Sequence, residues 1–344
     1  MGRVALPTEV ETALRKTPRR FLITGVGGFI GSHLLERLLV LEQEVVGIDN
    51  FSTGSEKNIN DVRHAVGEVC WRRSSLVNAN ICDYQSCFKA AKGCHIILHQ
   101  AALGSVPRSI KDPLTTTRVN VEGFCNIAWA AKENKVERVV YASSSSVYGD
   151  SEELPKREGV LGNSLSPYAA SKRTNELFAD AFVRSYGLEL VGLRYFNIFG
   201  PRQDPSGPYA AVIPRWILAM LSGQPCTIFG DGTNSRDFCF IENVIQANLI
   251  CSVTKRAEAL NRVYNIAVGE QTNLNELYQM LSTMIASRTS REVSKPNFEP
   301  FRVGDVKHSL ADISLAKNLL GYIPGVQVRE GLERTVNWFI ERGL

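Results

Sequence analysis

A tyrosine and a lysine four residues apart, Tyr168 and Lys172, could do acid–base chemistry. On a helix this spacing places both side chains on one face. A phenol has a pKa near 10, too high for a base at neutral pH. An ammonium about 4 Å away, at an effective dielectric of about 20, would favour the phenolate by roughly 4 kcal/mol, or about three pKa units. The pair is therefore predicted to lower the pKa of Tyr168 and make it a general base for an alcohol.

Four consecutive serines, 143–146, stand at the end of a predicted strand and before Val147-Tyr148-Gly149. A serine hydroxyl at this point would orient the oxygen that reacts with Tyr168. The alternative is an exposed tyrosine and lysine on an amphipathic helix, which is common for this spacing alone. The motifs that precede the pair favour the catalytic interpretation.

The most informative of these motifs is a glycine-rich turn near the N-terminus. Residues 21–24 resemble a short buried strand, Gly25, Gly28 and Gly31 follow at three-residue intervals, and 29–41 has the apolar period of a helix. Strand, glycine turn and helix in this order are typical of a dinucleotide site. The helix N-terminus would offer unpaired N–H groups to the phosphates. A glycine-rich turn without a ligand is the alternative.

Asp49 decides between these two interpretations. It closes a second predicted strand, 18 residues after Gly31 (49 − 31), where an acid would hold the hydroxyls of the adenosine ribose. A carboxylate there repels a 2′-phosphate, so the predicted cofactor is NAD rather than NADP. The positively charged nicotinamide would assist Lys172 in favouring the phenolate of Tyr168.

The elements that must position these residues alternate between strand and helix as far as about residue 200. This alternation predicts an α/β fold with a Rossmann-type, doubly wound parallel sheet. The predicted strands are 21–24, 44–49, about 70–78, 95–99, 137–142 and 189–196, and the predicted helices lie near 29–41, 55–66, 84–91, 113–133 and 167–186.

The chain is expected to divide into three parts. Residues 1–20 form a basic N-terminal extension with at most one or two helical turns, and 21–200 form the NAD-binding domain. Several prolines crowd together after Gly200, and shorter elements follow. We therefore expect 201–344 to form a smaller mixed α/β substrate lobe over the carboxyl ends of the strands. The boundary is soft, and segments are expected to cross between the two parts.

Composition excludes several other classes of protein. The 344 residues are 44% hydrophobic and 22% charged, typical of a globular protein, and a net charge of +4 is too small and dispersed for nucleic-acid binding. The eight cysteines lack metal-ligand spacing, so no metal site is predicted, and reduced thiols suit the cytoplasm. No apolar run approaches 18 residues, so no contact with a membrane is expected.

Taken together, the motifs resemble the extended short-chain dehydrogenase/reductase family over residues 21–344. They stand in the family's order: Thr24 to Gly31, Asp49-Asn50, His99-Gln-Ala-Ala102, the serines, Tyr168 with Lys172, and Leu193-Arg-Tyr-Phe-Asn197. Within the family the sequence is most similar to UDP-N-acetylglucosamine/UDP-N-acetylgalactosamine 4-epimerases.

The resemblance implies roles for individual residues. Tyr168 is the catalytic base, Lys172 activates it and binds ribose, and Ser144 supplies the hydroxyl. The cofactor-binding residues that it implies are Gly25, Gly28, Phe29, Ile30, Gly31, Asp49, Asn50, Ser52, Thr53, Gly54, Asn80, Ile81, Gln100, Ala101, Ala102, Asn120, Tyr168, Lys172 and Tyr195.

The resemblance also implies a substrate site. Asn197, Arg236 and Arg302 would bind the diphosphate, because arginine forks suit phosphate oxygens, and Asp305 would bind the uridine ribose. Ser309 occupies a position similar to the family's sugar-pocket gate, where a small residue leaves room for a 2-acetamido group. The implied substrate-binding residues are Ser105, Ser144, Ser145, Tyr168, Asn197, Gln203, Val212, Arg236, Arg302, Asp305 and Ser309.

Two departures from the family pattern concern the cofactor. Asn80 precedes Ile81 where an aspartate is usual beside adenine, although asparagine still offers an acceptor. Gly27 replaces a small side chain, which is expected only to add backbone freedom.

The serines also help to choose the reaction. The related dehydratases and decarboxylases carry acids in this segment, and Ser145 and Ser146 are not acids. The predicted reaction is therefore reversible C4 epimerisation through a 4-keto sugar, with tightly bound NAD.

The open alternatives are a UDP-glucose/UDP-galactose or UDP-glucuronate 4-epimerase and, in another class, a non-enzymatic NAD-binding regulator. A homodimer is expected by analogy with relatives, which pair the helices near 113–133 and 167–186.

Overall fold

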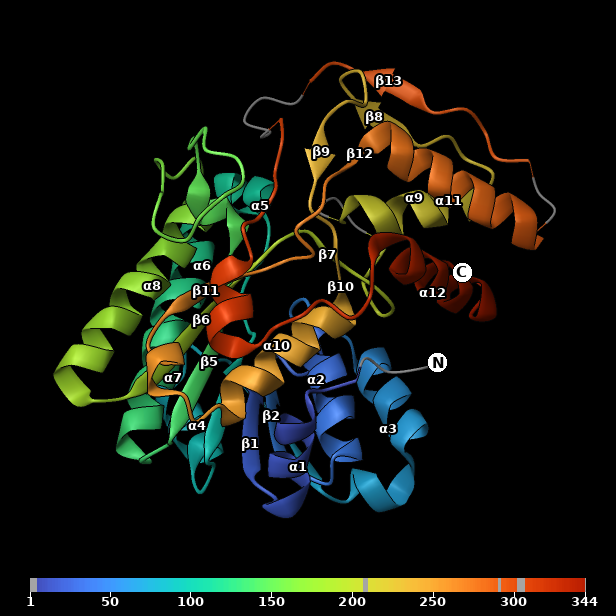
Figure 1. Cartoon of the computed structure of the whole chain (residues 1–344). Helices are drawn as coiled ribbons and strands as arrows, with labels where there is room; N and C mark the ends of the chain where they lie inside the picture. Colours follow the sequence, from blue (N-terminus) through green and yellow to red (C-terminus); the bar gives the residue numbers. More distant parts are fainter. Residues whose placement is uncertain (1–4, 207–209, 290–291, 302–306, 344) are drawn as a thin grey trace.

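A seven-stranded parallel sheet forms the centre of the computed structural model, which describes residues 5–206, 210–289, 292–301 and 307–343 (Figure 1). The strand order is β11-β6-β5-β4-β1-β2-β3. This order confirms the predicted Rossmann-type fold and adds one strand, β11, that was not predicted. The strands are β1 (Arg20–Thr24), β2 (Glu44–Asp49), β3 (Ser74–Asn78), β4 (Ile96–His99), β5 (Arg138–Ser144), β6 (Glu189–Tyr195) and β11 (Val263–Ile266).

The buried strands form because their residues are apolar on both sides. In β1, Phe21 and Ile23 face one hydrophobic core while Leu22 faces the other. Such two-sided burial is typical of parallel sheets covered by helices on both faces. The carboxyl ends of β1, β2, β4 and β5 therefore open at one edge of the sheet, where Gly25, Asp49, Gln100 and Ser144 lie.

Two groups of helices cover the sheet (Figure 1). One face packs against α2 (Phe29–Val40), α3 (Glu56–Trp71) and α10 (Ile241–Val253). The other packs against α4 (Tyr84–Ala91), α7 (Gly123–Glu133) and α8 (Pro167–Tyr186).

Two predicted boundaries need correction. The third strand begins at Ser74 rather than near residue 70, because α3 continues to Trp71 after a kink at Gly67 (φ +74°). The predicted helix 113–133 is present but is built from α6 (Pro113–Thr117), a π-helical turn η1 (Arg118–Glu122) and α7. The short helix α5 (Val106–Lys111) precedes them. Wide turns inside helices are frequent at functional sites, and η1 contains Asn120.

The N-terminal extension is more ordered than the sequence predicted. Helix α1 (Thr8–Lys16) has nine residues, with Val10 and Leu14 buried. The Gln43 side chain donates a hydrogen bond to the carbonyl of Leu14 (3.0 Å). This segment is therefore part of the core rather than a loose basic arm.

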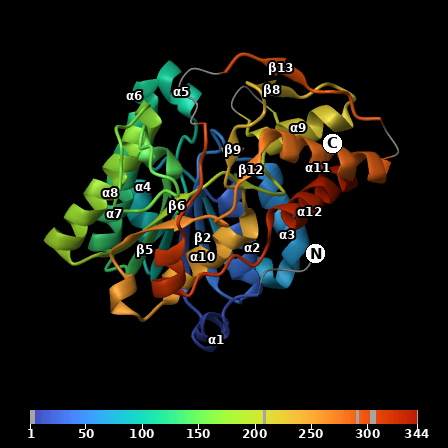
Figure 2. The same cartoon turned by 45° about the horizontal axis from the view of Figure 1, so that its top comes forward.

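The C-terminal half contains short elements that lie together in both views (Figures 1 and 2). They include the parallel pairs β7 (Ile198–Phe199) with β10 (Cys239–Phe240) and β8 (Thr227–Phe229) with β13 (Asn297–Glu299), and the antiparallel pair β9 (Ser235–Arg236) with β12 (Thr272–Asn273). The helices are α9 (Val212–Leu221), α11 (Leu274–Thr289) and α12 (Val328–Glu341), with short turns η2 (Ser145–Tyr148), η3 (Ala257–Ala259) and η4 (Ala316–Leu320) elsewhere.

After residue 200 the chain leaves the central sheet and later returns to it. The returning segments are α10, which packs on one face, and β11, which forms an edge strand. The division at residue 200 stays a prediction. None of the helices in the described part of the chain is both long and apolar enough to cross a membrane.

Candidate active site

Glycines shape the turn between β1 and α2. Gly25 has φ +71°, and a Cβ there would lie 2.9 Å from the Cα of Ala101. A Cβ on Gly31 would approach the Gly25 carbonyl, with the carbonyl carbon 2.8 Å away. Gly28 precedes α2 without any side-chain cap, so no capping side chain occupies the N–H groups of the first turn.

A cleft of about 340 Å³ lies at this turn. The structure brings together most of the residues that were predicted to bind the cofactor. Those lining the cleft are Gly25, Gly28, Phe29, Ile30, Gly31, Asp49, Asn50, Ser52, Thr53, Gly54, Asn80, Ile81, Gln100, Ala101 and Ala102. Ile48, Ala79, Leu103, Gly104 and Val119 also line it and were not predicted.

Asp49 is held in place by backbone groups on both carboxylate oxygens. Oδ2 accepts from the N–H of Gly27 and Oδ1 from the N–H of Phe51, each at 2.8 Å. Each oxygen retains a lone pair for a ribose hydroxyl. Gly27 does more than add backbone freedom, because a Cβ there would lie 2.7 Å from the Phe51 ring. That expectation is corrected: the Phe51 ring occupies the space of the missing side chain.

Two predicted cofactor residues lie behind the wall of the cleft. Tyr195 donates its hydroxyl to Gln100 Oε1 (3.1 Å) and accepts from Asn248 (2.9 Å). Asn120 is buried and holds the backbone of Leu103. Its Oδ1 accepts from the Leu103 N–H (2.8 Å), and its Nδ2 donates to the Leu103 carbonyl (3.2 Å). In this structure both residues hold parts of the wall in place.

Asn80 lies in the wall itself, and its Oδ1 accepts from the N–H of Cys82 (2.9 Å). Part of the acceptor capacity that was expected to serve adenine is therefore used within the loop.

The catalytic candidates meet where β5 ends and α8 begins. Ser166 caps α8 by accepting from the Ala169 N–H (3.1 Å), and Pro167 occupies the first turn as predicted. Lys172 is buried, and its Nζ donates to the carbonyl of Ala142 in β5 (2.8 Å). Tyr168 shares a hydrogen bond with Ser144, the last residue of β5. One strand end and one helical turn thus assemble the predicted triad.

Burial sets the titration of this pair. Burial raises the pKa of Tyr168 above its usual value of 10, although the Ser144 hydrogen bond acts in the opposite direction. Burial also lowers the pKa of Lys172 from 10.5 to about 8, opposed by the negative charge of Glu176. In the protein alone the pKa of Tyr168 is raised rather than lowered, because loss of water disfavours the charged form of both groups. The predicted fall, which includes the charge of the nicotinamide, stays a prediction.

A buried ion pair between Arg194 of β6 and Glu176 of α8 fixes the helix that carries Tyr168 and Lys172. Arg194 of β6 donates twice to the Glu176 carboxylate, with both distances 2.8 Å. Glu176 also accepts from the Ser143 hydroxyl (2.6 Å), and it lies one helical turn after Lys172. The Arg194 Nη1 continues the network to the Tyr148 hydroxyl (3.0 Å).

The Glu176–Arg194 ion pair was not predicted from the sequence. The signal was present, because Glu176 continues the four-residue spacing of Tyr168 and Lys172, and Arg194 is a charge inside an apolar strand. Buried charges are rare unless they are paired.

Two predicted substrate residues, Arg236 and Ser309, lie on adjacent segments. The Ser309 N–H donates to the Ser235 carbonyl (3.0 Å), and the Arg236 Nη1 donates to the Lys307 carbonyl (3.1 Å). Ser309 is half-buried. Arg302 and Asp305 lie outside the described residues.

The remaining predicted substrate residues lie on several elements. Asn197 has φ +31°, and its carbonyl accepts from the Cys239 N–H (3.3 Å), joining β7 to β10. Gln203 donates to the Ile198 carbonyl (3.1 Å). Ser105 caps α5, Ser145 opens η2, and Val212 opens α9. No cluster of three or more metal-binding side chains occurs among the residues that the structure describes.

The cleft fits NAD on structural grounds. A cradle that a Cβ on Gly25 or Gly31 would fill gives the pyrophosphate close access to backbone N–H groups. Asp49 presents a fixed carboxylate where a 2′-phosphate would be repelled.

Comparisons with known proteins agree with this geometry. Residues 21–267 match the model of the "NAD dependent epimerase/dehydratase family". A putative UDP-glucose 4-epimerase of Methanocaldococcus jannaschii is 36% identical over 92% of this chain and 97% of its own length.

Two solved structures are also similar. A UDP-N-acetylglucosamine 4-epimerase of Methanobrevibacter ruminantium, in complex with UDP-N-acetylmuramic acid, has a TM-score of 0.86 and 36% identity over 95% of this chain and 99% of that one. A UDP-glucose 4-epimerase of Thermotoga maritima, with UDP-glucose, has a TM-score of 0.85 and 31% identity over 94% of this chain and 100% of that one.

The ion pair beneath the triad gives the first prediction. Glu176→Gln should lower the free energy of unfolding by about 3–5 kcal/mol, because Arg194 would keep a buried charge without its partner. Side chains of Arg194 and Glu176 are only 3% and 5% exposed. Chemical denaturation measures the effect. The matched control is Asp180→Asn, one turn further along α8, where a 62% exposed carboxylate should contribute less than about 1 kcal/mol. Equal effects of the two changes would contradict the assignment.

The buried lysine gives a second prediction. Below pH 8, Lys172 is charged in the folded and unfolded states, so folding bears the whole cost of burying the charge. Between pH 8 and 10.5 the unfolded chain binds more protons, and stability rises with pH. The difference in unfolding free energy between wild type and Lys172→Met should therefore increase by about 3 kcal/mol over this window. A difference that does not vary with pH would show that the lysine titrates normally.

Proposed function

Because the chain belongs to the NAD dependent epimerase/dehydratase family and is an NAD-dependent isomerase, we propose that it interconverts UDP-N-acetylglucosamine and UDP-N-acetylgalactosamine at C4. The observation that carries the proposal is the meeting of Ser144, Tyr168 and Lys172 where β5 ends and α8 begins. The alternative of a non-enzymatic NAD-binding regulator is therefore not pursued, because the chain belongs to a family of enzymes.

The residues of the triad act on one hydroxyl of the sugar. NAD, when bound, supplies the acceptor that takes the C4 hydride and gives it back, and its positive ring favours the Tyr168 phenolate. Tyr168 removes the proton from O4 and later returns it. Ser144 donates a hydrogen bond at O4 while that oxygen carries negative charge. Lys172, fixed by the Ala142 carbonyl, holds a positive charge one helical turn after the tyrosine.

Epimerisation requires the sugar to present both faces to the same base. After oxidation, the sugar is a ketone at C4 and no longer has a configuration there. Arg236 and Arg302 would hold the diphosphate, so that the hexose turns about this tether. Arg236 approaches Ser309 through the backbone pairs of their two segments. Arg236 therefore lies next to Ser309, the residue that the family resemblance assigns to the sugar pocket.

Ser309 supports the N-acetylated substrates. It is a small, half-buried residue beside Arg236, and a 2-acetamido group needs the volume that a larger side chain would fill. The similar enzyme of Methanobrevibacter ruminantium is described with UDP-N-acetylmuramic acid, and the similar enzyme of Thermotoga maritima with UDP-glucose. UDP-glucose/UDP-galactose is thus the second candidate pair, and UDP-glucuronate is the third.

We also propose that the enzyme is a cytoplasmic homodimer. All eight cysteines are free, which suits a reducing compartment. Helices α5, α6 and α8 expose apolar side chains, including Ile110 (63%), Leu114 (82%) and Leu177 (59%). Exposed apolar groups on neighbouring helices are typical of a protein–protein contact.

The catalytic role of Tyr168 can be tested by removing its hydroxyl. Tyr168→Phe should reduce kcat on UDP-N-acetylglucosamine at least a hundredfold, because general base catalysis typically contributes about 10²–10⁴. Binding of UDP, whose diphosphate and ribose are assigned to other residues, should be unchanged when measured by calorimetry. A variant that retains more than about a tenth of the wild-type rate would refute the assignment.

The role of Ser309 can be tested by filling the space beside it. Ser309→Tyr should lower kcat/KM on UDP-N-acetylglucosamine by about tenfold or more, while kcat/KM on UDP-glucose changes much less. Ser309→Ala is the matched control and should keep both activities. An equal loss on both sugars would count against a gate at this position.

The homodimer can be tested through its apolar surface. Light scattering should give the mass of two chains for the wild type and of one chain for Leu114→Glu. Val69→Glu, which alters a 79% exposed residue on α3, should remain dimeric. A monomeric wild type would exclude the proposed assembly.

A further inference from the structure

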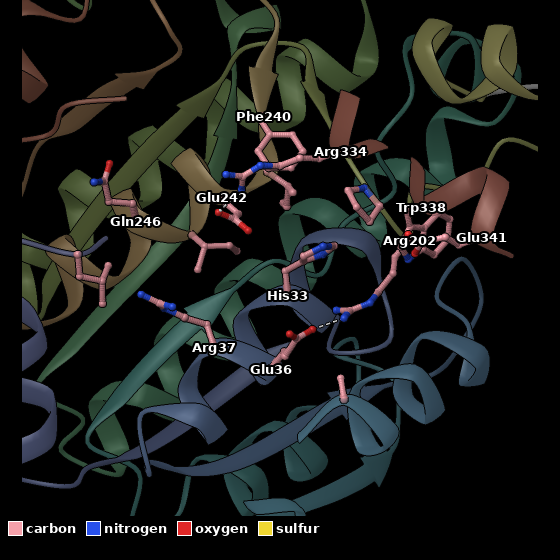
Figure 3. Close-up of a pocket in the computed structure, with 15 residues that line it drawn as sticks. His33, Glu36, Arg37, Arg202, Phe240, Glu242, Gln246, Arg334, Trp338 and Glu341 are labelled. Carbon is pink, nitrogen blue, oxygen red and sulfur yellow. Dashed lines mark hydrogen bonds and ion pairs between the residues drawn. The ribbon is translucent and has the colours of Figure 1, made fainter. Parts of the chain in front are cut away.

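A second cavity of about 380 Å³ lies farther along α2 than the cofactor cleft (Figure 3). Its walls come from several separate parts of the chain. Glu36 belongs to α2, Gln246 to α10, Trp338 to α12, and Arg202 to the loop after β7. None of the residues predicted to bind NAD or substrate lines it.

Arg202 brings an incompletely paired cation into this cavity. Its side chain is only 9% exposed, and one nitrogen, Nη2, contacts the Glu36 carboxylate. Nε and Nη1 are buried without a hydrogen-bond partner among the described residues. Figure 3 shows the side chain reaching across the cavity to Glu36, close to His33. Buried donors without partners are costly, at about 1–3 kcal/mol or more for a charged group, so they call for an acceptor.

The backbone at Arg202 reinforces this point. Its φ is +64°, in the left-handed region that costs a residue with a side chain roughly 1–2 kcal/mol. The loop therefore holds an unfavourable conformation at the residue that places a cation in the cavity. Backbone strain of this kind is found most often at ligand sites.

The acidic side chains that line the cavity do not accept hydrogen bonds from Nε or Nη1 of Arg202. Glu36 is already paired with Arg202, and Glu242 is paired with Arg334 (3.2 Å). Glu341 is exposed at the end of α12. Among the described residues no side chain accepts from Nε or Nη1, so a water molecule or a ligand can supply the missing acceptor.

The remaining lining fits an organic ligand better than a bare ion. Phe240, Ile245 and Trp338 give the cavity apolar walls, and its size lies within the range of small-molecule pockets. Gln246 adds a buried Oε1 that has no hydrogen-bond partner in the described structure, although its Nε2 donates to the Ala5 carbonyl. A ligand here would place an anionic group on Arg202 and an apolar body against these walls.

We propose that this cavity binds a small organic anion, a carboxylate or a phosphate monoester carried on an apolar body, at a site separate from the catalytic cleft. The site shares two chain segments with the predicted active site. Phe29, Ile30 and Gly31 at the start of α2 line the cofactor cleft, and Gln203 follows Arg202 in the chain. A ligand held by Arg202 would therefore contact α2 and the loop after β7, which both continue toward the predicted active site.

Calorimetric titration of the NAD-loaded enzyme can test the proposal with four probes. They are 3-phenylpropionate, phenyl phosphate, the neutral analogue 3-phenylpropanol and inorganic phosphate. The proposal predicts saturable binding of 3-phenylpropionate, phenyl phosphate or both, with a Kd at least about tenfold below that of either control probe. The stronger of the two identifies the anionic group that the site prefers.

Variants locate the binding. Arg202→Met should weaken the organic anion at least about tenfold, whereas Arg329→Met, an exposed arginine at the start of α12, should leave the Kd unchanged. Arg236→Met should also leave it unchanged, because Arg236 belongs to the predicted substrate site. Weakening by Arg236→Met with none by Arg202→Met would overturn the proposal, as would the absence of saturable binding by both organic anions.

A crystal structure of the wild-type enzyme with the bound probe keeps the test decisive if Arg202→Met does not fold. The probe's anionic oxygen should lie within hydrogen-bond distance of Arg202 Nε or Nη1. Ordered water at these nitrogens, with the probe elsewhere, would contradict the assignment.

Discussion

The active site depends on the attachment of the first turns of α8 to the end of β5. Three contacts make this attachment: Lys172 to the Ala142 carbonyl, Glu176 to the Ser143 hydroxyl, and the Glu176–Arg194 ion pair. Together they fix the helix to two neighbouring strands. Because Ser144 and Tyr168 belong to these same elements, the distance between hydroxyl and phenol is determined by the scaffold. Preorganisation of this kind allows polar groups to act without rearrangement during the reaction.

The attachment also explains the unusual electrostatics. Lys172 and Tyr168 are both removed from water, so each is less easily charged than in solution. Glu176 partly compensates by stabilising the lysine cation, while its own charge is balanced by Arg194. The protein alone therefore holds a protonated tyrosine. In the proposed mechanism, the positive charge of the nicotinamide would favour the phenolate and so link proton removal to the presence of the cofactor.

Much of this arrangement was predictable from sequence, because short-range patterns encode it. Glycine spacing, the acid at Asp49 and the positions of Tyr168 and Lys172 each follow one element of a regular alternation. The cleft brings together the residues that these motifs indicated. The fold was accessible for the same reason, since buried parallel strands have continuous apolar runs.

The features that were not predicted depend on contacts between residues that are far apart in the sequence. The pKa of Tyr168 is governed by burial, which no local spacing reveals, and the Glu176–Arg194 pair joins residues 18 positions apart. Tyr195 and Asn120 act through Gln100 and Leu103, so their motif alone could not show that they lie behind the wall. Strand β11 was missed because it is short and follows a long excursion of the chain. The docking of α1 was missed because nine residues with two buried side chains give little periodic signal.

The central claim is that this scaffold carries out a reversible oxidation confined to C4 of a nucleotide sugar. Its most direct test is incubation of the purified, NAD-containing protein with UDP-N-acetylglucosamine deuterated at C4, in ordinary water and without added oxidant. The account predicts UDP-N-acetylgalactosamine that retains the deuterium at C4. Absence of the epimer, or a product whose label has been lost to solvent, would contradict it.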